Sequence, residues 1–126
     1  MTALATISDD APGITKPTPQ TGFRAAVALY PGCGMEHVQR RFVPYAPVLM
    51  LIAAADDEVS PAACRKLAAR SRALGAPVEI AVYDGAQHDF DDPGRTRQGA
   101  EANRRAPADA RRRATGLFAT ALTPMR

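Results

Sequence analysis

The chain has 126 residues, of which 46% are apolar and 6% aromatic, and its formal net charge is +3 at pH 7. This length allows one domain with a modest core, and it is short for a complete wound α/β enzyme. The small positive charge does not by itself indicate a nucleic-acid partner, and no apolar run approaches the length that crosses a membrane.

The two cysteines, Cys33 and Cys64, bear on the compartment. They form neither a C-x-x-C pattern nor the spacing of zinc ligands, so we expect free thiols in a reducing compartment. The N-terminus lacks the basic start and the long apolar stretch of a signal peptide. The sequence therefore predicts a cytoplasmic protein without a metal or other cofactor.

The first elements are weakly patterned. Residues 2–8 (TALATIS) have the length of about two helical turns, and residues 9–22 hold three of the eleven prolines, which is typical of an exposed loop. Residues 25–30 (AAVALY) are a continuous apolar run that a Pro-Gly pair ends, so they predict a buried strand. Residues 31–46 show no clean period, and we expect a loop there with a helical turn.

The strongest element is the apolar run of residues 47–53 (PVLMLIA), which two aspartates follow after a short alanine pair. An apolar run without alternation is typical of a strand that is buried on both faces of a sheet. Ser60 and Pro61 then begin a helix, because serine is a good N-cap and proline fits the first helical position. Gly75 suits the position just past the end of this helix.

The last elements alternate between apolar and polar stretches. Residues 78–83 (VEIAVY) alternate as in a strand nearer the edge of a sheet, and residues 108–122 predict a closing helix with one apolar face. The arginine-rich residues 91–106 have no apolar period, so we expect a long loop or a partly disordered lid. The order of the elements predicts an α/β fold with three parallel strands and flanking helices.

An acidic and a basic side chain follow two of the predicted strands. Asp56 follows the strand of residues 47–53, and His88 follows the strand of residues 78–83, 32 residues further along the chain. Parallel strands end at the same edge of a sheet, so both side chains should emerge there. A carboxylate that bonds a histidine fixes its tautomer and stabilises its protonated form, which a general base requires. The alternatives are a capping role for Asp56 and a solvated His88.

The larger part of the sequence resembles the dienelactone hydrolase family, a branch of the α/β-hydrolase fold. Residues 83–90 (YDGAQHDF) match the family's Tyr-x-Gly-Ala-x-His-x-Phe segment at Tyr83, Gly85, Ala86, His88 and Phe90. Residues 28–33 (ALYPGC) are similar to the strand and turn that follow the nucleophile helix. The resemblance covers roughly residues 23–122 and implies an ester or lactone hydrolase in which Asp56 and His88 are catalytic.

The third member of the expected triad is missing from the sequence. In this fold a nucleophile precedes the acid and the histidine, at a Gly-x-Ser-x-Gly or Gly-x-Cys-x-Gly turn, and no such motif occurs here. Cys33 lacks the first glycine of that pattern and lies after the strand that should follow the turn. We therefore expect residues 1–22 to be the remnant of the nucleophile helix plus a flexible loop, and residues 23–126 to be the C-terminal half of an α/β-hydrolase domain.

The function that the resemblance implies is hydrolysis of a small-molecule ester or lactone, by a truncated chain that is inactive alone. Asp57 has the commoner spacing to Pro61, but Asp56 keeps the usual distance from the strand, so we favour Asp56 as the acid. The alternative function is a non-catalytic interaction module that pairs, or self-associates, through an open sheet edge. The arginine-rich residues 95–113 include no aromatic side chain to stack on bases, so we expect no nucleic-acid partner.

Overall fold

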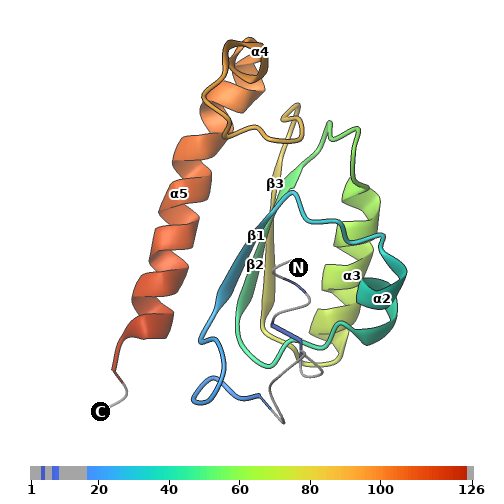
Figure 1. The fold of residues 1–126 in the computed structure, drawn as a ribbon, viewed down its shortest axis with the longest axis vertical. Helices are drawn as coiled ribbons and strands as arrows, with labels where there is room; N and C mark the ends of the chain where they lie inside the picture. Colours follow the sequence, from blue (N-terminus) through green and yellow to red (C-terminus); the bar gives the residue numbers. More distant parts are fainter. Residues whose placement is uncertain (1–3, 5–6, 9–16, 125–126) are drawn as a thin grey trace.

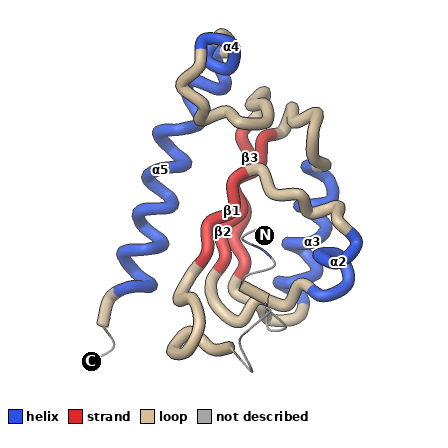
Figure 2. The backbone as a smooth tube through the Cα atoms, viewed as in Figure 1, coloured by secondary structure: helices blue, strands red, loops and turns tan. Residues whose placement is uncertain are grey.

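The computed structural model describes Leu4, Ile7, Ser8 and residues 17–124. In that part of the chain, three parallel strands form one sheet in the order β1-β2-β3, with helices on both faces (Figures 1 and 2). The elements along the chain are β1 (Ala26–Leu29), α2 (Glu36–Arg41), β2 (Val48–Ala53), α3 (Pro61–Ala73), β3 (Val78–Tyr83), α4 (Arg95–Gln98) and α5 (Glu101–Leu122). This is the predicted α/β architecture. The helix predicted over residues 2–8 and the first part of the following loop lie mostly outside the described residues.

The central strand β2 separates two hydrophobic cores. All six of its residues are buried, as the continuous apolar run predicts. Val48, Met50 and Ile52 enter the core under α2 and α3. Leu49, Leu51 and Ala53 enter the core under α5. Figure 1 shows these helices on opposite sides of the sheet, with the carboxyl ends of all three strands at the same edge.

Helix α3 begins and ends at the predicted signals. The Ser60 hydroxyl accepts a hydrogen bond from the backbone N–H of Ala63 at 3.1 Å, which satisfies one of the free donors at the helix N-terminus. Pro61 occupies the first helical turn. Gly75 takes a φ of +81° after the last turn, a conformation that suits a residue without a β-carbon. Helix α3 is therefore fixed at both ends.

The prediction of a loop or lid over residues 91–106 is wrong. Helix α4 lies inside this range, and α5 begins at Glu101, seven residues before the predicted start of the closing helix. The buried face of this first part of α5 consists of Asn103 and Ala106, which are too small or too polar to give an apolar period. Small side chains let the helix lie close to the sheet. At the other end of α5, Phe118 and Leu122 are 39% and 58% exposed, so the predicted apolar face is only partly buried.

The prediction of free thiols is also wrong, because Cys33 and Cys64 form a disulfide bond. The bond joins the turn after β1 to the first turn of α3, and both residues are buried. Parallel neighbours β1 and β2 bring these two segments to the same edge of the sheet, although 31 positions separate the cysteines in the sequence. The argument for a reducing compartment therefore fails. Among the described residues, no helix combines the length and the apolar character needed to cross a membrane.

Strand β1 has one paired edge and one open edge within the described sheet. The N–H groups of Ala26 and Tyr30 donate to the carbonyl groups of Pro47 and Leu51, at 2.9 and 2.8 Å. Because consecutive residues of a strand direct their backbone groups to opposite sides, Val27 and Leu29 direct theirs to the open edge. Such an edge can pair with a further strand.

Candidate active site

The loop after β2 holds the Asp56 carboxylate in a defined orientation. Its Oδ1 atom accepts hydrogen bonds from the backbone N–H groups of Glu58 and Val59, at 2.9 and 3.0 Å. The side chain is only 1% exposed, although the loop lies at the surface. Both bonds to Oδ1 come from the loop itself, so the other oxygen, Oδ2, is free to face a partner from another segment.

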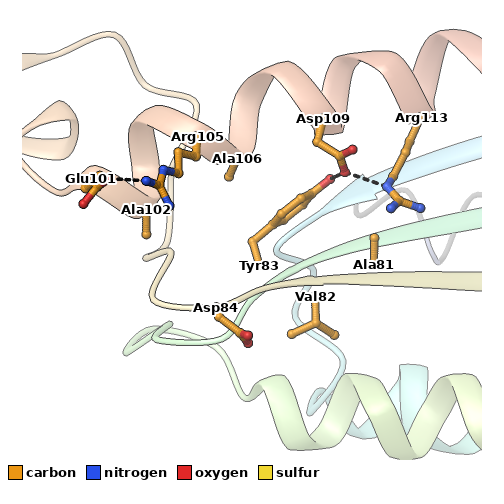
Figure 3. A pocket seen from close by; sticks show the side chains of 10 residues that line it. All are labelled: Ala81, Val82, Tyr83, Asp84, Glu101, Ala102, Arg105, Ala106, Asp109 and Arg113. Atoms are coloured by element: carbon orange, nitrogen blue, oxygen red, sulfur yellow. Dashed lines mark hydrogen bonds and ion pairs between the residues drawn. The ribbon is translucent and has the colours of Figure 1, made fainter.

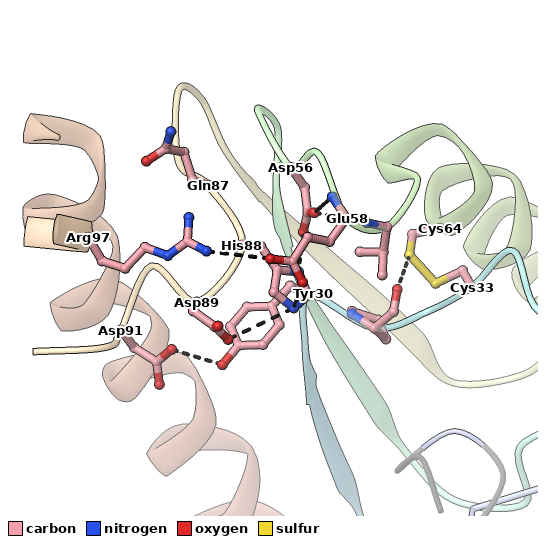
Figure 4. A network of polar contacts seen from close by, with 12 residues as sticks. Tyr30, Cys33, Asp56, Glu58, Cys64, Gln87, His88, Asp89, Asp91 and Arg97 are labelled. Atoms are coloured by element: carbon pink, nitrogen blue, oxygen red, sulfur yellow. Dashed lines mark hydrogen bonds and ion pairs between the residues drawn. A yellow bond between two sulfur atoms is a disulfide. The ribbon is translucent and has the colours of Figure 1, made fainter. Parts of the chain in front are cut away.

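That partner is His88, in the loop after β3. The imidazole Nδ1 lies 2.9 Å from Asp56 Oδ2 (both residues are labelled in Figure 4). The two loops are also joined through their backbones, because Ala55 N–H donates to the carbonyl of Ala86 at 2.9 Å. With the carboxylate accepting at Nδ1, the tautomer that remains has Nε2 unprotonated and able to take a proton. Asp57, the other candidate acid, is exposed on the same loop.

The buried side chain of Asn103 supports the histidine loop from α5. Its Oδ1 accepts a hydrogen bond from the backbone N–H of Gln87 at 2.9 Å, and its Nδ2 donates to the Gln87 side chain at 3.1 Å. The same Nδ2 donates to the carbonyl of Arg97 at 2.9 Å. Asn103 is fully buried, so these bonds replace the water that the polar groups would otherwise bind. No sequence pattern indicated this residue, because a single asparagine in a polar stretch is common.

Helix α5 is itself tied to β3 by a charged cluster (Figure 3). The Tyr83 hydroxyl donates to Asp109 at 2.9 Å, and the Arg113 guanidinium donates to the same carboxylate at 2.6 Å. Burial, and then the bond to Asp109, raise the pKa of Tyr83 to about 12. A pocket of about 540 Å³ lies beside this cluster, between β3 and α5, and neither Asp56 nor His88 lines it. The cluster thus serves to hold α5 and lies apart from the Asp56–His88 pair.

The second nitrogen of His88 faces acidic side chains. Nε2 lies 3.5 Å from Glu58 Oε2 and 3.9 Å from Asp89 Oδ1. The Arg97 guanidinium lies 3.5 Å from the other oxygen of Glu58. Acidic side chains therefore flank the ring nitrogen of His88 that does not contact Asp56. Glu58 was not singled out from the sequence, since a glutamate in a loop is usually solvated.

Tyr30 is a further neighbour of His88 that the sequence did not reveal. It follows β1, and its ring centroid lies 4.5 Å from that of the imidazole. Its hydroxyl donates to Asp91 Oδ1 at 3.0 Å. Burial and this carboxylate hold the pKa of the Tyr30 phenol well above its usual range. The tyrosine therefore stays neutral and keeps its hydroxyl proton for Asp91.

Stability should depend on pH through Asp56. Burial alone would raise the pKa of this carboxyl, but the hydrogen bonds from Val59, His88 and Glu58 outweigh burial, so its pKa lies below the ordinary value. The ionised form therefore stabilises the fold above pH about 4, and this contribution is lost as the pH falls through the lowered pKa. We expect the difference in unfolding free energy between the unmodified chain and Asp56→Asn to shrink from pH 6 to pH 3. Urea unfolding at both values measures it, and a constant difference would contradict the expectation.

The described residues bring together Asp56 and His88, the carboxylate and the histidine that the sequence predicts as acid and base. Cys33, whose neighbours partly match the Gly-x-Cys-x-Gly pattern, cannot act as the nucleophile in this state, because its sulfur is bonded to Cys64. The interactions of the His88 side chain in this part of the chain are with Asp56, Glu58, Asp89 and Tyr30. The pair lies at the carboxyl ends of adjacent parallel strands, where the α/β-hydrolase fold places the acid and the histidine of its triad.

Comparison with known proteins places the chain in a family. The model of the dienelactone hydrolase family matches residues 15–122, so this chain belongs to the dienelactone hydrolase family. No curated protein matches the chain. Among solved structures, the propionate-bound esterase 2 of Thermogutta terrifontis is similar with a TM-score of 0.66 and 16% identity, over 98% of this chain and 53% of the esterase.

Other solved structures agree on the fold. The same esterase phosphoramylated by tabun gives a TM-score of 0.66 and 17% identity, over 98% of this chain and 52% of that one. A Klebsiella pneumoniae protein that carries the provisional name dienelactone hydrolase gives a TM-score of 0.54 and 27% identity, over 75% of this chain and 41% of that one. This chain thus spans about half the length of the structures that it resembles.

Proposed function

We propose that this chain supplies the acid and the base of an ester or lactone hydrolase of the dienelactone hydrolase type. Asp56 orients His88 through Nδ1 and stabilises its protonated form. His88 takes a proton at Nε2 from a Ser or Cys nucleophile, and later activates water to release the acyl group. The observation that carries this proposal is the 2.9 Å contact between Asp56 Oδ2 and His88 Nδ1, which leaves Nε2 for the reaction.

The nucleophile and the oxyanion donors come, in this proposal, from a polypeptide segment that pairs with the open edge of β1. A parallel strand added there ends at the same edge of the sheet as Asp56 and His88, so a residue at its tip arrives beside Nε2. Loss of a single oxyanion donor lowers kcat by roughly 100-fold or more, so a chain without the nucleophile and these donors has negligible esterase activity.

The upstream DNA tests this proposal. An in-frame Gly-x-Ser-x-Gly or Gly-x-Cys-x-Gly should lie within a few codons before the codon for Met1. The extended chain should hydrolyse p-nitrophenyl acetate, and replacing the nucleophile or His88 with Ala should abolish the activity. A stop codon or an unrelated sequence at that place would remove the proposal. Turnover by the 126-residue chain that disappears in His88→Ala would contradict it as well.

A non-catalytic interaction module is the second candidate function, and the open edge of β1 favours it. Backbone groups of Val27 and Leu29 have no strand partner in the described sheet, and they could pair with a second copy of the chain. Size-exclusion chromatography with and without the upstream segment separates the two functions. Activity that appears on mixing supports the hydrolase, whereas a stable, inert homodimer supports the module.

A further inference from the structure

The backbone of Tyr30 has an unusual conformation. Its φ angle is +37°, a left-handed value that side chains with a β-carbon rarely adopt, and least often when they are bulky. Such strain persists only where surrounding contacts enforce it, and it is concentrated at functional sites. The conformation turns the chain sharply after β1, and Figure 4 shows the Tyr30 ring beside His88.

Three contacts fix the Tyr30 ring. It packs on the imidazole of His88 at 4.5 Å between centroids, and it meets the buried ring of Phe90 edge-on at 5.6 Å. Its hydroxyl donates to Asp91 at 3.0 Å. Asp56 holds His88 by one ring nitrogen alone, and a ring held at one atom can rock about that bond. The Tyr30 ring limits this movement from a different direction.

The disulfide bond holds the segment that carries Tyr30. Cys33 is three residues further along, and its bond to Cys64 attaches residues 30–33 to the first turn of α3. Cys64 Sγ also lies 3.2 Å from the carbonyl oxygen of Pro31, in contact with the strained turn. At the other end of the segment, Tyr30 N–H donates to the carbonyl of Leu51. The turn is therefore anchored on both sides.

We propose that Tyr30 is a positioning residue for His88, and that the Cys33–Cys64 disulfide keeps its ring in place. The role deepens the proposed function, because it concerns the orientation of the same base. A dithiol that attacks the disulfide breaks the S–S bond, becomes a cyclic disulfide itself and leaves two thiols on the chain, with two electrons and two protons transferred. The turn is then free to relax, the Tyr30 ring leaves His88, and the imidazole loses its fixed orientation.

Nuclear magnetic resonance of the histidine-labelled 126-residue chain tests the proposal without any need for activity. The chain has two histidines, so the His88 signals are assigned by a His37→Gln variant. In the unmodified chain, the Nδ1 proton shared with Asp56 should exchange slowly with water. In Tyr30→Leu this exchange should become about tenfold faster, because the imidazole opens more often. Tyr30→Phe keeps the ring and should retain the slow exchange.

Tyr83→Leu is the matched control. Tyr83 also packs on Phe90, at 5.3 Å, and also donates its hydroxyl to an aspartate, but its aromatic contact is with Phe90 and not with His88. Its loss should lower the melting temperature about as much as Tyr30→Leu and leave the His88 exchange unchanged. Equal acceleration of exchange in both variants would show that Tyr30 is merely structural, and would overturn the proposal.

Reduction by dithiothreitol and the double variant Cys33→Ala/Cys64→Ala test the part played by the disulfide. Both should accelerate exchange of the His88 Nδ1 proton as Tyr30→Leu does, and reoxidation should reverse the effect of dithiothreitol. Unchanged exchange in the folded double variant would overturn the proposal. The proposed function fails separately: an extended chain that is inactive while Tyr30 still controls His88 exchange would remove the hydrolase reaction and leave the positioning role.

Discussion

Asp56→Asn is expected to lower kcat for p-nitrophenyl acetate about 10⁴-fold in the extended chain that we propose. The structure gives a specific reason. Oδ1 of Asp56 accepts two backbone N–H groups, from Glu58 and Val59, so an asparagine must place its oxygen there and its NH₂ group toward His88. That NH₂ group donates to Nδ1, which forces the proton onto Nε2. The imidazole then has the wrong tautomer to accept a proton from the nucleophile.

Asp57→Asn is the matched control for this experiment. Asp57 is adjacent in the sequence and carries the same charge, but it is exposed on the loop. Its replacement should change kcat by less than about threefold, since a surface charge exchanged for an amide has a small effect. Equal losses in the two variants, or full activity in Asp56→Asn, would show that the acid has been assigned to the wrong residue.

Phe90→Ala is expected to lower the free energy of unfolding by about 3–5 kcal/mol. The side chain is fully buried in the core under α5, where it contacts the rings of Tyr30 and Tyr83 at 5.6 and 5.3 Å. Truncation removes its own burial and leaves a cavity beneath both tyrosines. Urea unfolding followed by circular dichroism measures the change.

Phe118→Ala provides the comparison for Phe90. The same atoms are removed, but Phe118 is 39% exposed on the last turns of α5, so little burial is lost. The cost should stay below about 1 kcal/mol. If the two alanine variants were equally stable, the core under α5 would not depend on Phe90, and the support of the two tyrosine rings would have to come from elsewhere.

Much of the fold could be predicted because it depends on strong local signals. The continuous apolar run at residues 47–53 became the central strand, and the alternating run at residues 78–83 became an edge strand. Helix α3 begins after Ser60 and ends before Gly75, as the preference of serine for N-caps and of glycine for positive φ predicts. The proximity of Asp56 and His88 followed from a topological rule, because parallel strands end at one edge. Their catalytic role stays a prediction.

The features that could not be predicted depend on contacts between distant segments. The first turns of α5 bury Asn103 and small alanines, which carry no hydrophobic period, so this part of the helix resembled a polar loop. The Cys33–Cys64 bond could be predicted only from the pairing of β1 and β2, which brings the two sulfur atoms together. Tyr30 looked like an ordinary residue at a strand end, and only its positive φ and its contact with His88 distinguish it.

The hydrogen bonds of the Asn103 side chain have a consequence for mutations far from Asp56 and His88. The Asn103 side chain accepts the hydrogen bond of the Gln87 backbone N–H. The loop that bears His88 therefore depends on the docking of α5, although neither Asp56 nor His88 lies on α5. A premature stop codon between the codons for Asp91 and Ala100 would leave the whole sheet and both members of the Asp56–His88 pair encoded. In that polypeptide the backbone N–H of Gln87, next to His88, would have lost its acceptor. A truncation near the C-terminus would therefore have the same effect as damage to the Asp56–His88 pair.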